Sequence, residues 1–386
     1  MNSERQSTGF LRDKLSYRVK EELRTINDVE SEYWTLLLYY ANVREKGQAI
    51  IKSPNARLRS NAWPAMSAFL KQAKTYYDSA HNLHHRAASL NFYYCFLNLA
   101  KATIICNRPE LYNKVFVHGL SGRHSTHSNL FDRTSKVFTG VTNTGDYNAF
   151  DLLYNVMFET NLPRTVFLPI GTLMRYISEA SYQNMKASSN RPKFVTGLYA
   201  IIVDSENKEE ATFWPQLALK SFASFHEYPT FRDNFLSKFE QVSVEANKAR
   251  EVYGIYAEEH GYTTYFQSKE VFPDSPYANV YFTASEYIKT ALGNHLQPQY
   301  YADNNDFYIN LPLRRTLQKP MNECLAIYIV IHHLSELVRY QPYYLEKLLT
   351  SKEAWVLDSI IDTCASMFMR GITPLITNID YRVTPR

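Results

Sequence analysis

HHRAASLNFYYCFLNLAKATIIC, residues 84–106, is apolar on almost every side when it is drawn as a helix. A surface helix carries one apolar stripe, whereas a helix that is apolar all round lies inside a core. The segment Asn107-Arg108-Pro109 follows, and such a segment is typical of a helix end. We therefore expect a central buried helix over these residues.

Apolar residues recur at helical spacing on both sides of this stretch. Pro64 suits the first turn of a helix, so the second predicted helix is expected to start there. Residues 110–147 show no clear periodicity and are expected to form a long loop. The further predicted helices cover residues 28–51, 64–82, 148–190, 322–339, 343–349 and 352–370.

The pattern changes in the second half of the chain, where β-branched and apolar runs alternate with turn-like clusters. The predicted strands are Val195–Val203, Glu209–Leu219, a hairpin of Arg250–Glu258 with Tyr262–Lys269, and Tyr308–Leu311, with a helix over 231–248. The fold class is therefore α+β, mainly a helical bundle with a β-rich insertion. We expect an N-terminal helical domain at 1–190, an α+β insertion at 191–311, and C-terminal helices at 312–386 that pack back on the bundle.

Composition excludes few classes of protein. The 386 residues are 45% hydrophobic, enough for a sizeable core, and 42 basic residues against 38 acidic ones give a net charge of only +4. Dedicated nucleic-acid binders usually carry a larger or more clustered excess. The 30 tyrosines suit interfaces and base stacking, although a coding bias of an AT-rich genome gives the same excess.

Targeting segments and cofactor motifs are not found in the sequence. The N-terminus is polar without an apolar core, and the longest apolar runs fall short of the ~20 residues of a membrane span, so we expect a cytoplasmic protein with no membrane contact. No Cys-x-x-Cys, Walker A, Gly-x-Gly-x-x-Gly, His-Glu-x-x-His or Gly-x-Ser-x-Gly sequence occurs. We expect no cofactor and no metal.

Two segments resemble known proteins. FYYCFLNLAKATIICNRPELYNKVFVHGLSG (92–122) is similar to the helix and His-Gly-Leu of the YaaC-like family, and LAIYIVIHHLSELVRYQPYYLEKLLTSKEAWVLDSIID (325–362) is similar to its C-terminal helix. That family is uncharacterised and implies no catalytic residues. Helical proteins of this kind in defence-linked gene clusters suggest a bacterial anti-phage defence assembly.

The segment 84–122 also resembles, more loosely, HEPN-like helical domains. Many of these are ribonucleases that use an Arg followed by a His after four to six residues. No Arg of this chain has a His at that spacing, since Arg123 and His127 are separated by three residues and His118 precedes the Arg. The departure argues against ribonuclease activity.

The loop from His118 to His127 is the first candidate site. Imidazoles can act as acid and base near neutral pH, and Arg123 can hold a phosphate, so His118, Arg123 and His127 are the catalytic candidates. The other interpretation is a polar loop in which His118 caps or hydrogen-bonds a neighbouring helix.

Two polar stripes on apolar helices are binding candidates. His332, Glu336 and Arg339 lie at i, i+4 and i+7, as do Tyr94, Asn98 and Lys101, and the stripes are expected to share a cleft with the histidine loop. They could form an anion site, or they could be a structural ion-pair network with Lys101 extending to the surface.

A short basic loop, with Arg314 and Arg315, is the last binding candidate and could contact phosphates, although such loops are usually just solvated.

These features favour a non-enzymatic helical interaction protein that binds a protein partner or nucleic acid. The alternatives are a divergent HEPN-like ribonuclease that uses the histidine loop, and a nucleotide or small-molecule sensor that uses the cleft. A homo-oligomer is compatible with all three.

Overall fold

The computed structural model describes residues 2–4, 15–19, 26–83, 85–122, 129–204, 210–243, 261–276, 280–298, 306–314 and 319–383. The fold is α+β and mainly helical, with the largest sheet in the second half of the chain. The chain divides into two compact units. The sheet unit contains Met1–Ser16 and Lys193–Asn322, and the helical unit contains Tyr17–Pro192 and Glu323–Arg386.

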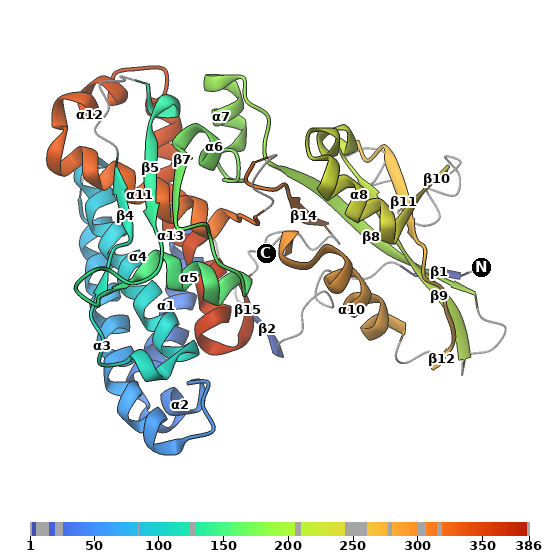
Figure 1. The fold of residues 1–386 in the computed structure, drawn as a ribbon, viewed down its shortest axis with the longest axis horizontal. Coiled ribbons are helices and arrows are strands. Elements are labelled where there is room, and N and C mark those ends of the chain that lie inside the picture. The colour runs from blue at the N-terminus through green and yellow to red at the C-terminus, as the bar shows by residue number, and fades with distance from the viewer. Residues whose placement is uncertain are drawn as a thin grey trace. The chain divides into compact units, whose positions relative to one another are not determined.

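The helical unit is a bundle around α4 (His85–Asn107), which packs against α3, α5, α11 and α13 (Figure 1). The central buried helix predicted over 84–106 is thereby confirmed. The other helices of this unit are α1 (Ile26–Asn42), α2 (Arg44–Ala49), α3 (Ala56–His81), α5 (Ala149–Phe158), α6 (Ile170–Met174), α7 (Ser181–Ser188), α11 (Glu323–Tyr340), α12 (Pro342–Leu349) and α13 (Ala354–Thr377).

The start of α3 differs from the prediction. The helix begins at Ala56 because the Asn55 side chain accepts a hydrogen bond from the Leu58 N–H at 3.1 Å and caps the first turn. Pro64 therefore lies inside the helix and not in its first turn.

Short strands interrupt the segment 110–147, which was predicted as a loop. β4 (Leu120–Gly122) and β7 (Thr165–Pro169) flank β5 (Thr134–Phe138) in an antiparallel sheet, and β3 (Phe116–Val117) pairs in parallel with β6 (Tyr147–Asn148). The continuous helix predicted over 148–190 is interrupted by β7. Elsewhere β2 (Leu15–Val19) pairs with β15 (Ile379–Val383).

The sheet unit holds an antiparallel sheet in the order β10-β11-β9-β8-β14-β13, with β1 on β8 and β12 on β9. The predicted strands near 195–203, 209–219 and 308–311 are present; of the predicted hairpin, 250–260 lies outside the described residues. The strands are β1 (Asn2–Glu4), β8 (Phe194–Asp204), β9 (Glu210–Leu219), β10 (Phe239–Val242), β11 (Thr264–Ser268), β12 (Phe272–Pro276), β13 (Leu296–Pro298) and β14 (Asp306–Asn310).

Two helices of this unit lie within the described residues. The helix predicted over 231–248 is shorter: α8 (Pro229–Lys238) ends where β10 begins, because Phe239 is extended and its side chain enters the aromatic core. The helix α10 (Val280–Leu292) was not predicted, and it buries Val280, Ala284, Ile288 and Leu292 at four-residue spacing against the same core.

Candidate functional site

Tyr93 on α4 connects two of the predicted site residues. Its hydroxyl is hydrogen-bonded to Nδ1 of His118, and its buried ring meets the His332 ring edge-on at 4.8 Å between centroids. The His118 and His332 rings lie 6.4 Å apart. The structure therefore places His118 near α11, with Tyr93, which the sequence analysis did not single out, in contact with both His118 and His332.

The predicted stripe on α4 divides into residues with different surroundings. Tyr94 stacks on Tyr76 at 5.2 Å, and Asn98 donates a hydrogen bond to the Tyr94 carbonyl at 2.7 Å. These contacts are internal to the bundle and structural. Lys101 lies with its Nζ 5.4 Å from the centroid of the Phe69 ring, and burial lowers its pKa.

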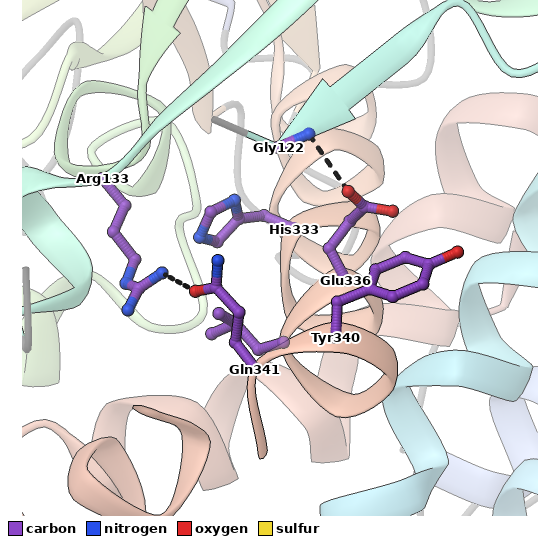
Figure 2. Close-up of a pocket in the computed structure, with 7 residues that line it drawn as sticks. Gly122, Arg133, His333, Glu336, Tyr340 and Gln341 are labelled. Atoms are coloured by element: carbon purple, nitrogen blue, oxygen red, sulfur yellow. Dashed lines mark hydrogen bonds between the residues drawn. The ribbon is translucent and has the colours of Figure 1, made fainter. Parts of the chain in front are cut away.

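Glu336 and Arg339 link α11 to strand β4. Nη2 of Arg339 donates to Oε1 of Glu336 at 2.8 Å, and Oε2 of Glu336 accepts the backbone N–H of Gly122 at 3.3 Å (Figure 2). The Glu336 carboxylate therefore bonds both Arg339 on the same helix and Gly122 on strand β4.

The histidines of this cluster are held in the neutral form. Burial lowers the pKa of His118, and the positive charges of Lys101 and Arg339 lower it further. Burial also lowers the pKa of His332 far below its usual value and that of His333 to about 3. Burial raises the pKa of the Tyr93 phenol, so that hydroxyl keeps its proton.

A small cavity lies beside α11, next to the contact between Gly122 and Glu336. Its volume is about 10 Å³, roughly the room for one water molecule. Nη1 of Arg133 donates to Oε1 of Gln341 at 3.0 Å, and both ring nitrogens of buried His333 lack a hydrogen-bond partner within the described structure (Figure 2). One ordered water there would satisfy a ring nitrogen, and the cavity is too small for a substrate.

The junction of α11 and α12 carries exposed aromatic rings beside cations. Tyr340 and Tyr343 are 61% and 65% exposed. The Arg339 guanidinium lies 5.0 Å from the centroid of the Tyr340 ring, and Nζ of Lys347 lies 4.5 Å from that of Tyr343. Tyr344 lies 5.6 Å from Tyr343, between centroids. We call these five residues the aromatic–basic face.

The structure does not place the other predicted residues relative to this cluster. Arg123, His127 and Arg315 lie outside the described residues. Arg314 is exposed and belongs to the sheet unit. Within the residues that the structure describes, no three His, Cys, Asp or Glu side chains are grouped so that they could hold a metal ion. None of the described helices has the length and apolar character to cross a membrane.

The model of one protein family, described as YaaC-like Protein, matches residues 28–376. The chain belongs to the YaaC-like family. No curated protein and no solved structure matches it. The looser HEPN-like resemblance stays a prediction.

In this YaaC-like chain, the functional candidates that the sequence analysis missed are Tyr93, Tyr340, Tyr343, Tyr344 and Lys347. A signal was present for the last four, because RYQPYYLEK (339–347) interleaves aromatic and basic residues as nucleic-acid-binding segments do. Tyr93 had no such signal, since its helix is apolar on nearly every side.

Proposed function

We propose that this YaaC-like chain is a non-enzymatic binding protein for single-stranded nucleic acid, with the aromatic–basic face as its contact surface. The observation that carries the proposal is that Tyr340 and Tyr343 are more than half exposed and that each has a cation beside its ring. Exposed rings of this size stack on unpaired bases, at about 1–3 kcal/mol per base, while Arg and Lys contact the phosphates.

Single strands fit this face better than duplexes do. Bases in a duplex are already stacked and present only their edges in the grooves, so tyrosine rings gain little from them. Tyr343 and Tyr344 follow each other on α12 with their rings at 66°, which suits bases that are splayed apart.

The neutral histidines support binding without catalysis. An acid–base pair needs one protonated and one unprotonated group near neutral pH. The pKa values of His118 and His332 are both lowered by burial, so neither is ready to act as the acid. The alternative, a divergent HEPN-like ribonuclease, depends on Arg123 and His127 and stays a prediction.

The wider expectations also stay predictions. They are a protein partner, a homo-oligomer, a cytoplasmic location and membership of a bacterial anti-phage defence assembly. The family match supports the resemblance from which the last of these was inferred.

Fluorescence anisotropy with labelled oligouridine and oligothymidine tests the proposal. We expect Tyr343→Ala to weaken binding about tenfold, in line with the loss of one stacked base, and Tyr343→Phe to bind like the parent. Tyr39→Ala, which removes a ring 44% exposed on α1, is the matched control and should have no effect.

Two results would overturn the proposal: no binding of either oligonucleotide at low salt, or equal weakening by Tyr343→Ala and Tyr39→Ala. Gel analysis of the same RNA mixtures separates binding from cleavage. Cleavage that is lost in His118→Ala would support the ribonuclease instead.

A further inference from the structure

A second candidate site lies in the helical unit and shares no residue with the aromatic–basic face. It is a recess of about 540 Å³, within the ~300–1,000 Å³ typical of small-molecule sites. Its walls come from residues 117–120, from 138–139 and 141–143, and from Asn148, Arg164 and Thr165. These segments include β3, β4 and the ends of β5 and β7.

Hydrogen bonds between the walls hold the recess open. The Thr139 hydroxyl donates to the Arg164 carbonyl at 2.5 Å, and Nδ2 of Asn148 donates to the Gly140 carbonyl at 3.0 Å. The Phe138 N–H donates to the Gly119 carbonyl at 2.9 Å. Because the walls are tied to one another, little ordering is required when a ligand enters, and that lowers the cost of binding.

The charges of the lining favour an anionic ligand. Among the described residues that form it, Arg164 and His118 are the titratable groups, and no carboxylate faces the ligand space. Thr139, Thr142, Asn143, Asn148 and Thr165 add neutral donors. Arg is the side chain best shaped to hold a phosphate through two parallel hydrogen bonds.

The rest of the lining is apolar. A flat, apolar ring system of a ligand could pack on this surface, which is made by Val117, Leu120, Phe138 and Val141. Phe138 carries an aromatic ring, which can pack against a heterocycle.

His118 can present a donor to this space. The pKa of Tyr93 is raised by burial, so its hydroxyl stays protonated and can donate to Nδ1 of His118. A neutral imidazole whose Nδ1 accepts carries its proton on Nε2. Because His118 also lines the recess, this N–H is the donor that we assign to a ligand oxygen.

We propose that this recess binds a small phosphate monoester with a heterocyclic body, of the class of nucleoside monophosphates. Arg164 holds the phosphate, the neutral donors and His118 hold ribose or phosphate oxygens, and the apolar wall takes the base. This site is independent of the aromatic–basic face, so either proposal can fail without the other.

Isothermal titration calorimetry of the full chain with AMP, adenosine and inorganic phosphate tests the site. We expect AMP to bind at least tenfold more tightly than either fragment. Arg164→Gln should weaken AMP about tenfold and leave adenosine unchanged, because only the phosphate contact is lost. The Thr139 bond to the Arg164 backbone survives this substitution, so the walls stay in place.

Arg57→Gln, at an exposed position of α3 outside both proposed sites, is the matched control and should bind AMP like the parent. Absence of AMP binding at millimolar concentration would overturn the proposal. So would AMP that binds no more tightly than adenosine, or an Arg164→Gln protein with unchanged AMP affinity.

Discussion

The Glu336 carboxylate on α11 accepts a hydrogen bond from the backbone N–H of Gly122 at 3.3 Å, although 214 positions separate the two residues. The same carboxylate pairs with Arg339 at 2.8 Å. One side chain therefore ties the end of β4 to the helix that bears the aromatic–basic face. One carboxylate oxygen bonds Gly122 and the other bonds Arg339, so a substitution can remove the ion pair and keep the backbone hydrogen bond.

We expect Glu336→Ala to lower the free energy of unfolding by about 1–2 kcal/mol, because the Gly122 N–H loses its acceptor. Glu336→Gln keeps an oxygen for that N–H and loses only a partly exposed ion pair, so its effect should be below about 1 kcal/mol. Urea denaturation followed by circular dichroism measures both. Equal losses in the two variants would contradict the assignment of the larger share to the Gly122 contact.

The close approach of α11 and α13 gives a second prediction. A Cβ added at Gly371 would lie 2.5 Å from Cβ of Cys324, far inside normal contact, whereas one added at Gly122 would lie 3.3 Å from Oε2 of Glu336. Gly371→Ala should therefore cost about 1–3 kcal/mol, the range for overpacked cores, and Gly122→Ala should cost less. Thermal unfolding of the two variants ranks them, and the reverse order would be inconsistent with this packing.

Arg370 is the charge at the centre of a third prediction. It is 5% exposed, and its Nη2 lies 3.1 Å from Oε1 of Glu179 and 3.7 Å from Oε2 of buried Glu323. Arg370→Met leaves the Glu323 charge inside the protein and should destabilise it by about 3–5 kcal/mol. Adding Glu323→Gln removes that charge, so the double variant should regain part of the loss in chemical denaturation. Purely additive losses would count against coupling of the pair.

The pH dependence of stability follows from the buried histidines. Burial lowers the pKa of His333 to about 3 and that of His332 far below its usual value, so between about pH 6.5 and those values the unfolded chain binds more protons than the folded one. Stability should fall as pH drops through this window, by up to about 1.4 kcal/mol per pH unit for each histidine.

Denaturation at several pH values between 5 and 7 checks this slope. The double variant His332→Gln/His333→Gln should show a flatter curve than the parent. His226→Gln, at an exposed position of the sheet unit, should run parallel to the parent. A double variant with an unchanged slope would show that these imidazoles are not held neutral by the fold.

The helical part of the fold was readable from the sequence where periodicity is strong. The α4 segment shows its burial directly, since apolar residues surround the helix, and α11 shows the same pattern. Prediction was wrong at Pro64 because proline favours the first turn of a helix, whereas the Asn55 cap starts α3 at Ala56 and leaves the proline in the interior. The strands β3 to β6 are two to five residues long, too short to establish alternation.

The candidate site was readable in part. Residue spacing placed His332, Glu336 and Arg339 on one helix face, and the structure joins Glu336 to Arg339. Residue spacing could not identify Tyr93 as the contact to His118. A helix that is buried on every side has no amphipathic pattern to show which residue faces which neighbour. The recess is formed by loops and short strands that are brought together by tertiary hydrogen bonds. No local sequence pattern predicts such contacts.

The division of the chain into two units affects the order in which its parts can fold during translation. The helical unit is interrupted after Pro192 and resumes at Glu323. The helices α1 and α4 are therefore synthesised long before α13, which packs against both, and before α11, which packs against α4. The intervening sheet unit is nearly continuous in sequence. It can fold while apolar surfaces of the first helices are still exposed to solvent. Nascent chains of this protein should therefore be clients of chaperones until translation passes α13.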